Sequence, residues 1–359
     1  MKSLKKYKIT SILICAILHS FIYTSCIDRL DFIGTTEEGQ LVIYGLLTDS
    51  GEKQIVTISR TSLLGLAPKG VPGAEVFLLT DSGEKIRYFD IGNGVYELIN
   101  YKVNDGKRYS LEVIFENNTY RSSFESLPKA TGEDNLSFTF KNEPFNNESP
   151  EPVFTVSTEC TFPETPEPIF IRWLVEETYL WERIWLPCVG WCPPPPPNCF
   201  ISDLIEPNRL NLFDGSNTGT RNTSLVLGKR QVDNSFISIF FVSVRQLSIN
   251  REAFIYWEKI KIAVSNQGSL FDIPPAPVFG NIYNAANPNE RVLGYFEVAK
   301  EKITRISTNR GDVPFFLNRP CEFIVGKPAS EYTAECIECD ERARGKKWTT
   351  IEPPWWNEN

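Results

Sequence analysis

The sequence contains almost no histidine: His19 is the only one among 359 residues. It lies in the first 25 residues, which have the composition of an export signal. A chain processed after that segment carries no imidazole. This absence excludes Ser-His-Asp and Cys-His nucleophile systems, together with every metal site that depends on imidazole.

Basic charge is also scarce, because 37 Lys and Arg face 45 Asp and Glu for a net charge of −8. Four of the basic residues, Lys2, Lys5, Lys6 and Lys8, precede the N-terminal apolar stretch. Without them, 33 basic residues face 45 acidic ones, a net charge of −12. Phosphate binding needs a concentrated basic surface, so the composition excludes nucleic acid as a partner and disfavours charge-driven binding to anionic lipid headgroups.

Catalytic motifs are missing as well: no G-x-S-x-G, P-loop or dinucleotide fingerprint occurs. Ser126 and Lys129 have the spacing of a serine/lysine nucleophile, but that motif needs a helix and Pro128 stands between them. Glu176 and Glu177 point to opposite faces of a strand, so they cannot flank one bond. We therefore expect no enzyme activity, no catalytic residue and no cofactor.

No apolar run is long enough to span a bilayer. The longest, Ile9 to Thr24, has 16 residues, short of the ~20 that a spanning helix needs. It ends in Tyr23-Thr24-Ser25-Cys26, which resembles a bacterial lipoprotein cleavage box. We predict a lipoprotein signal peptide over residues 1–25 and acylation of Cys26, since several acyl chains at ~0.8 kcal/mol per buried CH₂ anchor a protein durably. Plain secretion and an uncleaved anchor are the alternatives.

What the sequence does contain is a succession of short strands. After a polar tether at 26–39, alternating or apolar segments separated by Gly, Asn and Asp turns recur roughly every 10 residues, which predicts a β-sandwich over 40–130. The segment Leu127–Asp134 breaks the pattern and predicts a domain boundary. A second β-rich domain is expected over 131–340, followed by a Trp-rich C-terminal tail over 341–359.

One segment of the second domain has helical periodicity. Phe254, Trp257, Ile260 and Val264 fall near one face of a helix predicted near 250–265. We expect this aromatic stripe to pack onto a sheet.

Seven cysteines follow Cys26, namely Cys160, Cys188, Cys192, Cys199, Cys321, Cys336 and Cys339. In an exported protein they predict disulfides, and an odd number leaves at least one free or paired between chains. We expect one bridge among the last three and at least one among the first four, with the pairings left open. Zinc needs four ligands, which three clustered thiolates without histidine do not supply, so no metal is expected.

An aromatic and proline-rich segment surrounds three of these cysteines. It contains Trp181, Trp185 and Trp191, and a run of five prolines that includes Pro193, Pro195 and Pro197. A proline run cannot supply the backbone pairing of a core strand, and exposed aromatic side chains mark interaction surfaces. We predict that residues 181–199 form a rigid loop that contacts a partner. A cross-linked loop with a structural role is the alternative.

Several motifs occur in a distinctive order. They are Val244-Arg245-Gln246-Leu247-Ser248, Glu252-Ala253-Phe254-Ile255-Tyr256-Trp257, Gly268-Ser269-Leu270-Phe271-Asp272-Ile273-Pro274-Pro275, Gly280-Asn281-Ile282 and Leu293-Gly294-Tyr295-Phe296. Together they resemble an uncharacterised family of Bacteroidota outer-membrane lipoproteins, classed only as a domain of unknown function and commonly encoded beside SusC-type TonB-dependent receptors. Pro72-Gly73-Ala74-Glu75-Val76-Phe77-Leu78 and Gly94-Val95-Tyr96 resemble the Ig-like or transthyretin-like opening domain of that family.

The resemblance implies a mainly β protein, with an Ig-like or transthyretin-like sandwich followed by a second sandwich with one inserted helix. It implies a lipid-anchored protein of the outer membrane, facing the cell surface. We expect a non-catalytic accessory subunit of an outer-membrane β-barrel protein, first of all a TonB-dependent transporter. The alternatives are a subunit of barrel-insertion or secretion machinery, and a glycan-binding module that uses aromatic platforms.

Overall fold

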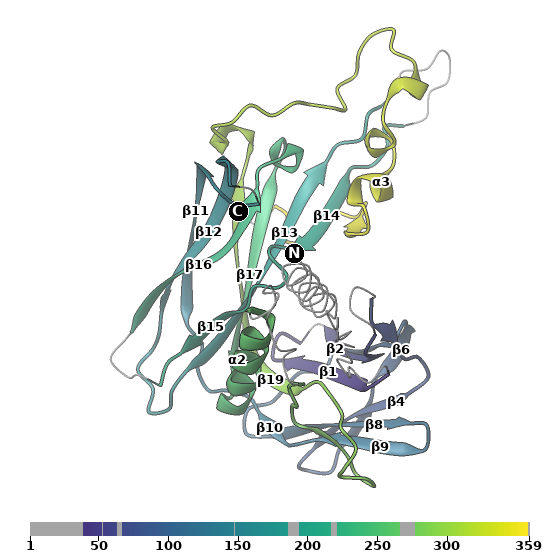
Figure 1. The fold of residues 1–359 in the computed structure, drawn as a ribbon, viewed down its shortest axis with the longest axis vertical. Helices are drawn as coiled ribbons and strands as arrows, with labels where there is room; N and C mark the ends of the chain where they lie inside the picture. Colours follow the sequence, from purple (N-terminus) through teal and green to yellow (C-terminus); the bar gives the residue numbers. More distant parts are fainter. Residues whose placement is uncertain are drawn as a thin grey trace, which may run out of the picture. The chain divides into compact units, whose positions relative to one another are not determined.

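The computed structural model describes residues 39–51, 53–62, 67–146, 148–185, 194–216, 221–265 and 277–357. Residues Glu37–Asn359 form one compact unit. The described part is mainly β-structure with a single long helix, as the sequence predicts. Figure 1 shows its strands arranged in several sheets.

The largest sheet in the described part has eleven strands. In spatial order they are β20 (Lys347–Thr349), β14 (Cys199–Leu204), β13 (Phe170–Trp181), β17 (Phe240–Ile249), β19 (Phe296–Thr308), β1 (Leu41–Thr48), β2 (Lys53–Arg60), β7 (Val95–Ile99) and β6 (Phe89–Gly92), with β15 (Asn211–Asp214) on β13 and β3 (Lys69–Gly70) on β2. β1 runs parallel to β19 and antiparallel to β2.

Two smaller sheets complete the β-structure. One contains β18 (Ile282–Asn284), β9 (Asn118–Ser122), β8 (Arg108–Phe115), β4 (Glu75–Thr80) and β5 (Lys85–Arg87), with β10 (Glu125–Ser126) on β8. The other contains β11 (Glu133–Glu143), β12 (Glu151–Thr161) and β16 (Asn222–Gln231). Each packs against a different half of the large sheet, so the unit contains two sandwiches with separate cores.

Alternation along each strand creates these cores. In β2, Val56 and Ile58 are buried, whereas the alternating Ile55 and Thr57 are half-buried on the other face. Strand β13 is covered on both faces. Its Ile171 and Trp173 belong to the core beneath the three-stranded sheet, while Phe170 and Leu174 pack with the long helix on the opposite face.

The predicted helix near 250–265 is confirmed as α2 (Arg251–Ser265). Phe254 packs against Phe170 of β13, with ring centroids 5.1 Å apart, so the aromatic stripe does cover a sheet. The remaining helical segments are short: η1 (Asn234–Phe236), η2 (Arg310–Asp312), η3 (Ala329–Glu331), η4 (Ala334–Cys336) and α3 (Cys339–Ala343). Within the described ranges, no helix combines the length and the apolar character needed to cross a membrane.

The chain does not separate into two domains at residue 130, which corrects the predicted boundary. β19 pairs with β1, and β18 pairs with β9, so two strands from the second half complete the first sandwich. A turn-rich segment marks the end of a local run of strands, but it carries no information about strands that return from far along the chain. The predicted division into domains at 40–130 and 131–340 is therefore replaced by two sandwiches that share one sheet.

The predicted tail at 341–359 is also part of the fold as far as residue 357. β20 pairs with β14 through Phe200, Ile201 and Ser202. Trp356 is buried against Phe200 and Phe241, with ring centroids 4.9 and 4.7 Å away. The tryptophans at the C-terminus therefore cover one end of the large sheet.

Candidate functional site

The segment predicted to contact a partner begins inside the core rather than outside it. Trp181 is the last residue of β13 and only 4% exposed, so it is not available to a partner. Its indole Nε1 donates a hydrogen bond to the carbonyl oxygen of Glu335 at 2.8 Å, and the guanidinium of Arg342 lies 3.9 Å from its ring centroid. The sequence prediction failed here because Trp181 still belongs to β13 and the C-terminal segment packs over the end of this strand.

The other residues of this segment are placed differently. Trp185 is 48% exposed, and Pro195 and Pro197 are exposed as well. Trp191, Pro193, Cys188 and Cys192 lie outside the described residues, as does the predicted acylation site Cys26.

Two disulfides hold the C-terminal segment in place. Cys321 pairs with Cys336, which confirms the bridge expected among the last three cysteines. Cys199 pairs with Cys339, 140 residues away, and so ties the start of β14 to α3. The two cysteines of the Cys336-x-x-Cys339 motif thus bond to different partners, which could not be deduced from their spacing.

Cys160 is a free thiol, which corrects its place among the disulfide candidates. It is buried on β12, where the side-chain amide of Gln246 donates to its sulfur at 3.4 Å. Burial, followed by the nearby charge of Asp134, raises the pKa of this thiol far above its ordinary value. A thiol held in its neutral form is a poor nucleophile, so Cys160 acts as a packed core residue.

The C-terminal strap, residues 313–357, crosses from the end of β19 to the ends of β13 and β14 (Figure 1). Its exposed tip is a tight turn in which Lys327 N donates to the carbonyl oxygen of Ile324 at 3.1 Å, with Gly326 at φ 85°. Tyr332 braces this turn, because its hydroxyl accepts a hydrogen bond from Ile324 N at 2.8 Å. The tip therefore has a fixed conformation within a disulfide-closed loop.

The tip presents apolar side chains to solvent. Ile324 is 55% exposed and Val325 is 89% exposed, next to the half-exposed ring of Phe323. Phe323 and Trp185 line the same cleft, of about 410 Å³, between the strap and the end of β13. We call these four residues the strap surface. Turns usually carry polar residues or glycine, so the apolar side chains at this braced turn form an unusual exposed apolar patch.

Charged side chains surround this cleft. Glu182, Arg319 and Glu322 line it together with the aromatic residues, and none of them forms an ion pair with another described residue. The cleft therefore combines aromatic faces with polar groups that are available for hydrogen bonding, which is the usual composition of a small-molecule site.

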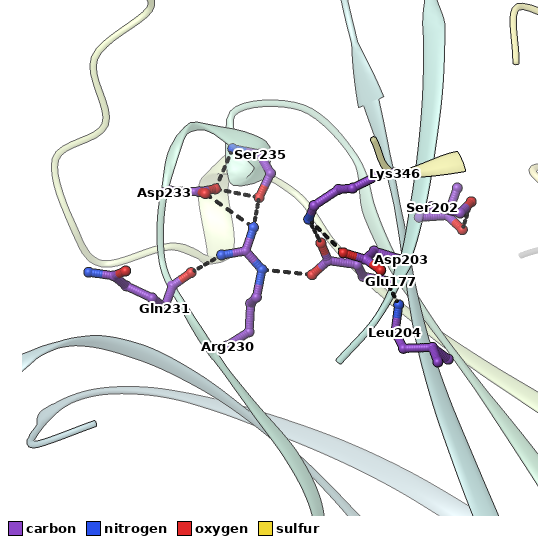
Figure 2. A network of polar contacts seen from close by, with 10 residues as sticks. Glu177, Ser202, Asp203, Leu204, Arg230, Gln231, Asp233, Ser235 and Lys346 are labelled. Atoms are coloured by element: carbon purple, nitrogen blue, oxygen red, sulfur yellow. Dashed lines mark hydrogen bonds and ion pairs between the residues drawn. The ribbon is translucent and has the colours of Figure 1, made fainter. Parts of the chain in front are cut away.

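A second polar cluster lies where β13, β14, β16 and the strap meet (Figure 2). Its centre is the buried Glu177, whose Oε2 accepts from Arg230 Nε at 2.7 Å and whose Oε1 accepts from Lys346 Nζ at 2.9 Å. Asp233 lies 3.1 Å from Arg230 Nη2, and Asp203 lies 3.2 Å from Lys346 Nζ. Figure 2 shows the two cations alternating with the three carboxylates.

The electrostatics of this cluster fix its charges. Burial opposes the charge of Arg230, but the carboxylates of Glu177 and Asp233 outweigh it and raise the arginine pKa. Burial likewise opposes the charge of Asp233, and Arg230 outweighs it, so the pKa of Asp233 is lowered. Arg230 and Asp233 are therefore both held in their charged forms, and the ion pairs of the cluster fasten the strap to the large sheet.

A third cluster joins α2 to the shared sheet. Arg172 of β13 forms an ion pair with Glu297 of β19, and the two residues are 3% and 0% exposed. Glu297 also accepts hydrogen bonds from Tyr44 Oη at 2.9 Å and Trp257 Nε1 at 2.8 Å. The guanidinium of Arg172 lies 4.1 Å from a ring centroid of Trp257. The buried carboxylate of Glu297 in β19 thereby links this strand to β1, β13 and α2.

Sequence reasoning missed both the strap surface and the charged clusters. The run Ile324-Val325 resembles a core strand in the sequence, and nothing local reveals that it lies on a turn. The pairs Arg172–Glu297 and Glu177–Arg230 are 125 and 53 residues apart in sequence. One available signal was the presence of Arg172 and Glu177 among the apolar residues of β13, since a buried charge requires a partner.

Among the described residues, no three His, Cys, Asp or Glu side chains converge in a way that could hold a metal ion. A search of curated proteins finds no match. A family model described as Domain of unknown function (DUF4249) matches residues 28–305, which include every strand up to β18 and nearly all of β19. The strap lies beyond this match. The chain belongs to the family of this domain of unknown function.

Proposed function

We propose that this chain is a non-catalytic accessory subunit of an outer-membrane β-barrel protein, first of all a TonB-dependent transporter. It is anchored through acyl chains on Cys26 and faces the cell surface. Two disulfides support export, because such bonds persist in oxidising compartments and are rare in the cytosol. The sequence features of residues 1–26 support the lipid anchor.

The observation that carries the proposal is the strap surface. Its apolar side chains stand on a turn that a hydrogen bond from the backbone to Tyr332 and the Cys321–Cys336 disulfide hold in one conformation. A surface that is already ordered loses little conformational entropy on binding, and aromatic side chains such as those of Trp185 and Phe323 are enriched in protein interfaces. The cleft beside this surface is lined by both acidic and basic side chains. Such mixed charge suits a protein partner better than it suits a partner that carries charge of one sign.

The test is affinity purification of the full chain from detergent-solubilised outer membranes. We expect a large β-barrel protein to co-purify, and its identity separates a transporter from barrel-insertion or secretion machinery. The double variant Ile324→Asp, Val325→Asp is expected to lose the partner at unchanged thermal stability. Ile262→Asp is the matched control, because Ile262 on α2 is also 55% exposed. Equal partner recovery from the double variant and the control would contradict the proposal.

A glycan-binding module is the second candidate, and the cleft beside Trp185 favours it. Sugar rings stack on aromatic faces while their hydroxyls bond to charged side chains, and the cleft offers both through Phe323, Glu182 and Arg319. Glycan-array binding that Trp185→Ala abolishes, without any co-purifying barrel protein, would favour this function over the first.

A further inference from the structure

Strand β11 is an open edge of the three-stranded sheet. It pairs with β12 in an unbroken register from Glu133 opposite Thr161 to Glu143 opposite Glu151. Its eleven residues include no proline and no glycine, and among the strands of the described residues none pairs with its outer side (Figure 1). Peptide groups on such an edge lack ladder partners, so a long regular edge strand is a template for pairing with another strand.

The opposite edge of the same sheet is protected. The backbone N–H of Lys229 in β16 donates to Glu206 Oε2 at 2.7 Å, and the side-chain amide of Asn211 donates to the carbonyl oxygen of Leu227 at 2.6 Å. No side chain of the described residues bonds in this way to the backbone of β11. In the described part of the three-stranded sheet, side chains from outside the sheet therefore bond to the backbone of the edge strand β16 but not to that of the edge strand β11.

The core beneath β11 is incompletely covered. Leu136, Phe138 and Phe140 point inward from this strand and pack against the core of the second sandwich, yet each is only partly buried. A further strand beside β11 would cover their open sides and remove apolar surface from water.

The outward face of β11 is complementary to itself. Glu133, Asn135, Ser137, Thr139 and Lys141 are all exposed on this face. Glu133 forms an ion pair with Lys302 of β19, but its side chain stays 76% exposed, so the carboxylate can also meet a second cation. In an antiparallel two-fold pairing centred on Ser137, Glu133 of each copy lies opposite Lys141 of the other, and Asn135 lies opposite Thr139. Directly opposite residues share a face, so the same register places Leu136 opposite Phe138 on the inner side.

We propose that β11 is a self-association edge, which pairs antiparallel with β11 of a second copy of this chain and joins two three-stranded sheets into one of six strands. The occupant is a second copy because opposite charges at the two ends match only when the strand meets itself in reverse. A two-fold interface requires such self-complementarity. This inference is independent of the proposed function, because it uses neither the strap surface nor the lipid anchor.

The register gives a sharp cross-linking test. Opposite residues in an antiparallel pair have Cβ atoms about 4.5–5.5 Å apart, so a small backbone adjustment permits a disulfide. The full chain with Ser137→Cys, oxidised with copper phenanthroline in detergent micelles, is expected to form a covalent dimer. Thr139→Cys alone is expected not to, because the two positions lie four residues, about 13 Å, apart along the strands. A mixture of Thr139→Cys and Asn135→Cys chains is expected to cross-link.

Charge reversal provides a second measurement by sedimentation equilibrium. Lys141→Glu places like charges together at both ends of the interface and is expected to weaken self-association about tenfold. Adding Glu133→Lys together with Lys302→Glu restores the opposite pairing between copies and keeps the ion pair within each chain, and is expected to recover affinity to within about threefold of the wild type. Lys102→Glu, which reverses an exposed charge outside β11, is the control. A wild-type chain that stays monomeric at about 100 μM, or a dimer that Lys141→Glu and Lys102→Glu affect equally, would overturn the proposal.

Discussion

The buried ion pair between Arg172 and Glu297 offers the most informative perturbation of the fold. Both side chains are almost inaccessible to water, and Glu297 has two further donors, Tyr44 and Trp257. Replacing Arg172 by methionine keeps most of the side-chain volume but leaves the carboxylate of Glu297 buried without a cation. Breaking a buried pair in this way costs about 3–5 kcal/mol.

A double variant separates the effect of the buried charge from the effect of the packing. Glu297→Gln together with Arg172→Met removes both charges and keeps an acceptor for Tyr44. Replacing a buried pair by neutral groups is often close to neutral in stability, so we expect the double variant to lose about 1–2 kcal/mol, less than Arg172→Met alone. The coupling between the two positions is then strongly non-additive.

Urea unfolding, followed by tryptophan fluorescence, measures these differences. With a slope of about 3 kcal/mol per M, the single variant is expected to lower the midpoint by about 1–1.7 M. Coincident transitions by fluorescence and circular dichroism are required before the free energies are compared. A loss below about 1 kcal/mol for Arg172→Met, or additive losses in the double variant, would refute the view that this pair fastens α2 to the shared sheet.

Four further predictions follow from the same structure. Replacing Cys199 and Cys339 together by serine opens a loop of 140 residues and is expected to cost up to about 5 kcal/mol of unfolding free energy, and an unchanged urea midpoint would contradict this. Burial raises the pKa of Glu125, so the folded state binds its proton more tightly and loses stability as pH rises from 4.5 through the raised value. Glu125→Gln is expected to flatten that part of the thermal stability profile, and a profile parallel to the wild type would count against it. Cys160 is expected to resist maleimide labelling until the chain unfolds, as mass spectrometry can show, and rapid labelling of the native protein would reverse its assignment to the core. Cys26→Ala is expected to release the protein from membranes, and retention after a carbonate wash without acyl labelling of the wild type would exclude lipidation.

The parts of the fold that depend on local patterns were predictable from the sequence. Alternating segments predicted short strands over residues 40–130, among which β2 lies, and the stripe of Phe254 and Trp257 predicted the helix near 250–265 that is present as α2. The shared sheet was not predictable, because the pairing of β1 with β19 joins segments some 250 residues apart. The candidate site divides in the same way. A bridge among Cys321, Cys336 and Cys339 was expected, although not which two of them pair, whereas the exposure of Ile324 and the burial of Trp181 depend on how the strap crosses the sheet.

The return of β18 and β19 to the first sandwich sets the order in which the chain can fold. Strand β1 emerges early in synthesis, but its parallel neighbour follows only after residue 296. The long segment between these two strands must close into a loop before their contacts can stabilise the fold, and such long-range pairing forms slowly. A chain that crosses a membrane from its N-terminus would therefore remain incomplete, and dependent on protection from aggregation, until nearly all of it has passed.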